Sequence, residues 1–236
     1  MNFKTRTAFI LLPGRLLLFL LVQLCFALLL GSFKHSANYW IATATITNFI
    51  SIAALVYLFK IQGMRFRDLF RFDQVALKKD ILIFFSITLF CIPIVFLPNY
   101  YLSIWFWGNE EIPYNMMFKP MPLYLVYSFF VLFPITTALG ELSTYFGYIM
   151  PGLKEYFQRK WLTITLPVFF LAVQHCTLPF IPDIKFIMYR ALMYFPFACV
   201  IGISLYKRPG LFPYFAILHG MLDFATVMVL LNISTG

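Results

Sequence analysis

Gly140-Glu141-Leu142-Ser143-Thr144-Tyr145-Phe146-Gly147-Tyr148-Ile149-Met150-Pro151 is the stretch around which the fold of this chain is organised. It ends a long apolar run, and Glu141 lies deep inside that run. A carboxylate within a membrane is energetically expensive, so such a residue usually marks a functional site and has a partner elsewhere in the bundle. The search for the partner of Glu141 begins with the rest of the chain.

The composition indicates a polytopic helical membrane protein. Of the 236 residues, 62% are hydrophobic and only 11% are charged, whereas about a quarter of a soluble domain is charged. Several apolar runs reach the roughly 20 residues that cross a bilayer as a helix, and they lack the alternation of barrel strands. We predict an all-α bundle of about seven transmembrane helices that forms one membrane-embedded domain, residues 1–236. The predicted spans are 10–31, 39–59, 81–97, 122–150, 161–178, 187–206 and 211–231.

The distribution of basic residues predicts the orientation. Most of the 18 lysines and arginines fall in the N-terminal segment and in alternate loops, as the positive-inside rule requires. Arg15 is counted with this inner set, and Arg190 with the few basic residues on the other side. The N-terminus is therefore predicted to be cytoplasmic. The net charge of +9 is explained by these loops, so we expect membrane lipids and no nucleic acid as partners.

Four acidic or imidazole side chains fall inside the predicted spans: Glu141, His175, His219 and Asp223. Each lies 11 to 15 residues from the nearest inner basic residue, a depth of about 16 to 22 Å at 1.5 Å per residue. His219 and Asp223 are four residues apart and share a helix face. Singly, each could be a hydrogen-bonded packing residue. Together, at similar depth, they predict one site.

Three short motifs resemble those of the CPBP intramembrane proteases, the CAAX prenyl protease and bacteriocin-processing group also called the Abi family. Gly140-Glu141 with Gly147-Tyr148 and Pro151 is similar to the first motif, Leu171–His175 to the second, and His219–Asp223 to the third. The resemblance covers about residues 120–225, the family-like catalytic core. The chain departs from the first motif at Leu142 and Phe146, where the family has a Glu and an Arg. Losing both members of a buried ion pair can be tolerated, whereas losing one strands the other.

The resemblance implies an intramembrane endopeptidase, a hydrolase that cleaves a membrane-anchored or lipidated protein, or a leader or sorting peptide. Glu141 is the candidate general base for a water, His175 would orient that water, and His219 would stabilise the oxyanion with Asp223 fixing its orientation. We expect no cofactor. The alternative is zinc held by His175, His219 and Glu141, a set of the kind that zinc hydrolases use.

Two other functions fit the same residues. A non-catalytic relative could use the fold for bacteriocin self-immunity or as a peptide-binding scaffold. A proton-coupled transporter could use the Glu, His and Asp side chains as a proton relay. The short loops and the family resemblance indicate a multi-pass protein of a prokaryotic plasma membrane. The sequence leaves the substrate, the metal dependence and the oligomeric state open.

Overall fold

The computed structural model describes all 236 residues, and every regular element in it is a helix. A π-helical segment, Ser143–Ile149, joins α7 to α8, and a 3₁₀ turn, His175–Thr177, follows α9. The helices are α1 Phe3–Leu11, α2 Gly14–Leu30, α3 Phe33–Ser36, α4 Trp40–Ile61, α5 Leu77–Trp107, α6 Glu111–Met117, α7 Leu123–Leu142, α8 Met150–Lys154, α9 Lys160–Gln174, α10 Ile184–Lys207 and α11 Phe212–Thr235.

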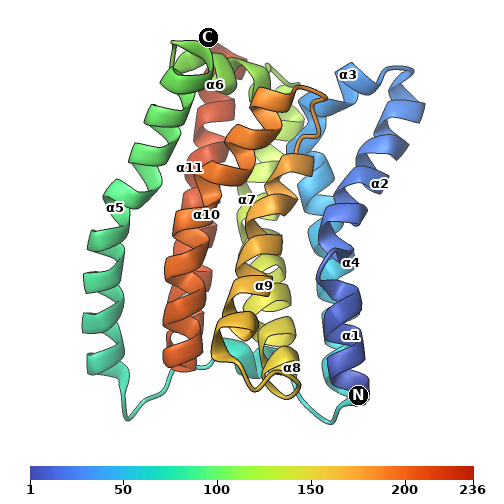
Figure 1. Ribbon diagram of the computed structural model, residues 1–236. Coiled ribbons are helices and arrows are strands. Elements are labelled where there is room, and N and C mark those ends of the chain that lie inside the picture. The colour runs from blue at the N-terminus through green and yellow to red at the C-terminus, as the bar shows by residue number, and fades with distance from the viewer.

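The predicted all-α membrane bundle is confirmed. Five helical segments are long and apolar enough to cross a membrane, and the bent pair α1–α2, with an angle of 46°, would be a sixth. The fifth predicted span, 161–178, corresponds to α9, which has only 15 residues and is not among these segments. The two termini lie at opposite ends of the bundle, and the basic loops lie at the N-terminal end (Figure 1). The cytoplasmic placement of that end stays a prediction.

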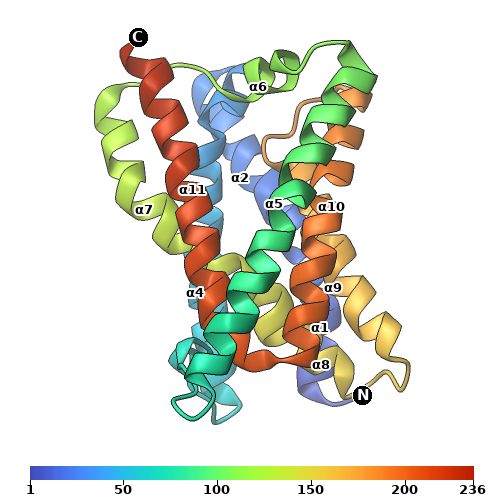
Figure 2. The same ribbon diagram turned by 90° about the vertical axis from the view of Figure 1, so that its left-hand side faces the viewer.

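The third predicted span, 81–97, is too short. Helix α5 runs from Leu77 to Trp107 and continues through both Pro93 and Pro98. The predicted span ends directly before Pro98, and proline removes a backbone donor and usually ends a helix. Proline is tolerated more readily inside membrane helices, and most of α5 is exposed along the side of the bundle (Figure 2).

Two apolar clusters stand one above the other in the bundle. The cluster towards the N-terminal end includes Leu12, Leu142 and Leu171, and the cluster towards the C-terminal end includes Phe19 and Phe133. Several chain segments pass from one cluster to the other. Buried or half-buried polar side chains lie at the level between the two clusters. We call this set the polar layer: Arg15, Asn48, Ser51, Glu141, Gln174, His175 and His219.

Two helix irregularities border the polar layer. The helix breaks between Leu11 and Gly14, at Pro13, directly before Arg15. The π-helical segment begins at Ser143, two residues after Glu141. Kinks have local causes such as proline, and π-helical turns are frequent at functional sites. Both irregularities therefore lie where the chain presents a charged side chain to the centre of the bundle.

Close packing of α9 against α10 depends on Gly202. A Cβ atom added at Gly202 would lie 2.5 Å from Cγ2 of Val168 and 3.2 Å from Cε1 of Phe146. We expect Gly202→Ala to lower the free energy of unfolding by about 1–3 kcal/mol, because overpacking a filled core forces side chains out of their rotamers. Thermal unfolding of the detergent-solubilised protein measures this.

Gly14→Ala is the matched control, since its added Cβ meets only Cδ2 of Leu11 at 3.8 Å. Its stability should be unchanged or raised, as alanine is the better helix former. The double variant Gly202→Ala with Val168→Ala should recover part of the loss. Equal stability of the Gly202→Ala and Gly14→Ala proteins would contradict this account of the α9–α10 contact.

Candidate active site

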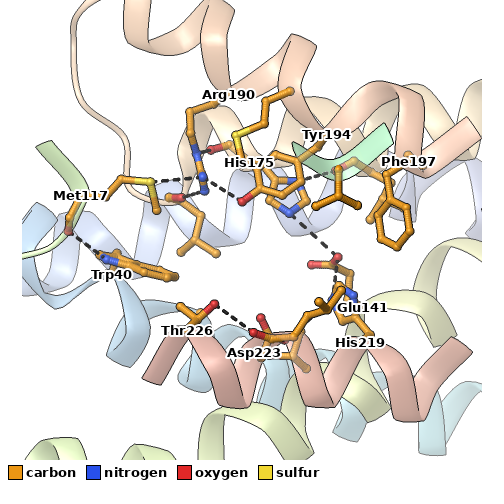
Figure 3. Close-up of a pocket in the computed structure, with 18 of the residues that line it drawn as sticks. Trp40, Met117, Glu141, His175, Arg190, Tyr194, Phe197, His219, Asp223 and Thr226 are labelled. Carbon is orange, nitrogen blue, oxygen red and sulfur yellow. Dashed lines mark hydrogen bonds and ion pairs between the residues drawn. The ribbon is translucent and has the colours of Figure 1, made fainter. Parts of the chain in front are cut away.

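All four predicted site residues line one cavity of about 640 Å³. Glu141 comes from the end of α7, His175 from the turn after α9, and His219 and Asp223 from α11. The remaining lining residues are mostly hydrophobic and come also from α2, α4, α5, α6 and α10. Segments far apart in the sequence therefore bring these polar groups together, as Figure 3 shows.

Glu141 is the centre of the cluster. Its Oε1 atom lies 3.2 Å from Nε2 of His219 and 4.0 Å from Nε2 of His175. The carboxylate is only 4% exposed, so each of these contacts acts in a medium of low dielectric constant, where charge interactions are stronger than in water. The partner that the sequence predicted for Glu141 is thus present on two other segments of the chain.

His175 is held in one orientation. Its Nδ1 lies 2.8 Å from the backbone oxygen of Leu171, and its ring stacks on Tyr194 with centroids 3.8 Å apart. A carbonyl oxygen only accepts hydrogen bonds, so Nδ1 carries the proton. In the neutral ring Nε2 is then an acceptor, and it faces Oε1 of Glu141 (Figure 3).

Asp223 is placed differently from the role we predicted for it. Its Oδ2 atom lies 3.8 Å from Nε2 of His219, the same nitrogen that contacts Glu141. That distance is too long for a hydrogen bond, and Nδ1 of His219 has no hydrogen-bond partner. Asp223 therefore lies near His219, and it does not fix the ring by a hydrogen bond.

Arg15 is a site residue that the sequence analysis missed. We assigned it to the inner basic set, but its side chain is 3% exposed, and its Nη2 lies 3.7 Å from Oε2 of Glu141. The guanidinium donates to the side-chain oxygens of Asn48 at 2.8 Å, Ser51 at 3.0 Å and Gln174 at 3.1 Å. These three hydrogen bonds from α4 and α9 fix the cation beside the carboxylate.

The polar layer is extended by neutral side chains. Tyr145 donates to the Gln174 oxygen that accepts from Arg15, at 3.1 Å, and the Asn48 amide donates to Thr137 at 2.9 Å. Polar residues inside apolar spans were the available sequence signal, and Asn48 and Gln174 both carry it. The network satisfies the buried Arg15, which would otherwise be costly.

The two departures from the family motif lie side by side in the apolar core. Leu142 and Phe146 are four residues apart, are 0% and 3% exposed, and belong to the same cluster. Both side chains are apolar, so neither introduces an unpaired charge into the core. The cation beside Glu141 is instead Arg15, from α2.

The zinc alternative has little geometric support. No three His, Cys, Asp or Glu side chains are grouped so that they could hold a metal ion. Arg15 already places a positive group 3.7 Å from Oε2 of Glu141, and a guanidinium at that distance would repel a divalent cation.

The chain was compared with protein-family models, with curated proteins and with solved structures, and none of the three comparisons gave a match.

The burial of the Arg15–Glu141 pair predicts a large stability effect. We expect Arg15→Met to lower the free energy of unfolding by about 3–5 kcal/mol, because it leaves a buried carboxylate without its counter-charge. Adding Glu141→Met to Arg15→Met should recover part of this loss. Unfolding in mixed micelles with increasing sodium dodecyl sulfate provides the measurement.

Lys4→Met is the matched control on the same N-terminal segment. Lys4 pairs with Glu155 at 2.6 Å, but its side chain is 23% exposed, and exposed pairs contribute about 0–1 kcal/mol. If Arg15→Met and Lys4→Met cost the same, the pair with Glu141 does not stabilise the bundle as described.

Proposed function

We propose that this protein is an intramembrane endopeptidase that uses Glu141 to activate water. The observation that carries the proposal is the convergence of one carboxylate and two imidazoles on a single cavity at membrane depth. Buried titratable groups that face each other in a cavity are the usual signature of a chemical site. The motifs that resemble those of the CPBP proteases contain these same residues. Membership of that family is part of the proposal.

The contact between Glu141 and His175 suits a nucleophilic water. Two acceptors, Oε1 of Glu141 and Nε2 of His175, face each other across 4.0 Å, which is too far for a direct bond and close enough for one bridging water. A water held there would donate one hydrogen to each acceptor. Its oxygen lone pairs would then point away from both bases, towards a substrate carbonyl in the cavity.

The proposed reaction follows from these positions. The water oxygen bonds to the carbonyl carbon as its proton passes to Glu141, which acts as general base. The oxyanion is stabilised by positive charge from His219, whose Nε2 lies beside the reacting carboxylate. The tetrahedral intermediate then breaks its C–N bond, and Glu141 returns the proton to the leaving amine. One water is consumed, and a carboxylic acid and an amine are formed.

The charges of the cluster balance during this cycle. Glu141 and Asp223 supply two negative charges, and Arg15 and a protonated His219 supply two positive charges. The proton that Glu141 takes from water leaves a net positive cluster while the substrate carries a negative oxyanion. Arg15 thus acts as a positioning residue, since it contacts Glu141 and not the reacting atoms.

The cavity walls suggest the class of substrate. They are mostly hydrophobic and belong to helices that span the membrane, so an apolar peptide segment would fit better than a charged one. We infer a membrane-anchored or lipidated protein, or a leader or sorting peptide, in a prokaryotic plasma membrane. A non-catalytic peptide-binding relative or a proton-coupled transporter would use the same cavity without cutting a peptide bond.

Proteolysis is tested with the purified chain in lipid nanodiscs. Substrates are first found by comparing new protein N-termini in cells that express the wild type or Glu141→Gln. We expect Glu141→Gln to lower the cleavage rate at least ~100-fold, as loss of a general base does, and His175→Ala to lower it strongly as well. Hydrolysis in H₂¹⁸O should place one ¹⁸O atom in each new carboxylate.

Glu155→Gln is the control, because this carboxylate lies outside the cavity and pairs with Lys4. It should cleave at the wild-type rate. Cells in which the wild-type chain generates no new termini, and in which Glu141→Gln and His175→Ala keep every function of the wild type, would refute the protease and favour the scaffold. Glu141-dependent proton flux without cleavage would favour the transporter.

A further inference from the structure

Arg190 is the second buried arginine of the bundle, and the proposed reaction does not use it. From the sequence we counted it with the few basic residues on the side opposite the inner loops, near the start of the predicted span 187–206. In the structure it lies on α10, is 2% exposed and lines the same cavity as Glu141. Figure 3 shows its guanidinium on the far side of His175 from Glu141.

The hydrogen bonds of Arg190 are made to neutral groups. Nε donates to the backbone oxygen of His175 at 3.2 Å, and Nη2 to that of Leu178 at 2.6 Å. Nη1 donates to the hydroxyl of Tyr194 at 2.9 Å and to the sulfur of Met117 at 3.2 Å. A thioether is a weak acceptor, and a guanidinium has five N–H donors. One donor on Nη2 is thus unused, and one on Nη1 is poorly used.

The positive charge of Arg190 has no carboxylate within 4.0 Å, whereas Arg15 has Glu141. The remaining acids that line the cavity are Asp223, which lies beside His219, and the exposed Glu110 and Glu111. Arg190 donates to backbone oxygens of the turn that follows α9. The partial negative charge at a helix C-terminus is only about half an elementary charge, so it balances the guanidinium only in part. An arginine cannot lose its proton in a protein, and a buried charge without a partner is strongly unfavourable.

We propose that Arg190 forms a carboxylate-binding subsite, which recognises an acidic group of the substrate. A carboxylate oxygen would replace the sulfur of Met117 as acceptor for Nη1 and occupy the unused donor of Nη2, the two-point contact that arginine makes best. The Tyr194 hydroxyl accepts from Arg190, so its own hydrogen is free to donate to the same ligand. The reading of this ligand as substrate rests on the proposed protease function.

The subsite is connected to the candidate active site through His175. Arg190 donates to the backbone oxygen of His175, and Tyr194 stacks on the His175 ring. A ligand that engages Arg190 and Tyr194 therefore contacts two of the residues that hold His175 in position. Binding energy gained at the carboxylate would be used to orient the reacting groups, as remote binding contacts do in enzymes.

Binding of matched probes tests the subsite without requiring a known substrate. The probes are N-acetyl-trileucine as the free acid and as the C-terminal amide, titrated into the full chain in nanodiscs at pH 7 by calorimetry. We expect the acid to bind at least ~10-fold more tightly than the amide, as for a charge-assisted two-point hydrogen bond. Titrations repeated in the Glu141→Gln background exclude hydrolysis of the probe.

Two variants locate the effect. Arg190→Gln should abolish the preference for the acid, and Lys185→Gln, which removes an exposed cation of the same helix, should leave it unchanged. Tyr194→Phe replaces Arg190→Gln if that variant does not fold, and should reduce the preference several-fold. The proposal is overturned if the wild type binds the acid and its neutral counterpart equally both in this pair and in a pair with a side-chain carboxylate. A preference that survives the Arg190 substitution, or that Lys185→Gln also removes, overturns it as well.

A second probe pair identifies the source of the carboxylate. N-acetyl-Leu-Leu-Asp-amide is compared with its Asn counterpart. This pair carries the carboxylate on a side chain, whereas the first pair carries it at the chain terminus. Preference for either acid supports the subsite and names its source. The outcome is separate from proteolysis, because acid-selective binding without cleavage would refute only the protease, and cleavage without acid selectivity would refute only the subsite.

Discussion

The carboxylate of Glu141 lies 3.2 Å from His219 and 3.7 Å from Arg15, in the middle of a bundle whose surroundings are apolar. A charge in such a medium must be matched and hydrogen-bonded, or the bundle is strongly destabilised. The groups that balance and hydrogen-bond this charge come from several helices, because Arg15 on α2 is itself fixed by Asn48 on α4 and Gln174 on α9. The contacts can form only if α2, α4, α7, α9 and α11 place these side chains at the same level of the bundle. One costly group thus determines how five helices stand relative to each other.

The two apolar clusters on either side strengthen this constraint. On α7, Phe133 belongs to one cluster and Leu142 to the other, with Glu141 directly beside the second. A slip of α7 by one turn, about 5.4 Å, would move the carboxylate among hydrophobic side chains with no cation in reach. Buried polar groups are known to specify register in other helical assemblies, and the polar layer has the same physical basis.

The sequence was sufficient to predict the helical bundle and the four acidic and imidazole groups, because Glu141, His175, His219 and Asp223 have no ordinary reason to be inside an apolar run. It was insufficient for Arg15 and Arg190. An arginine near the end of a span is expected to extend to the membrane surface, and an inward-facing arginine has the same sequence pattern. Only the packing of α2 and α10 decides between the two.

The 15 residues of α9 rise about 22 Å, less than the roughly 30 Å of a bilayer's hydrocarbon core. Hydrophobic mismatch of this kind is relieved when lipids thin around the short segment, at a cost of a fraction of a kcal/mol per Å. Thinning would be local to α9, because helices such as α10 and α11, with 24 residues each, are long enough for a full bilayer. The thinned annulus beside α9 would also shorten the route by which water reaches His175, so lipid chain length would set how well the site is hydrated.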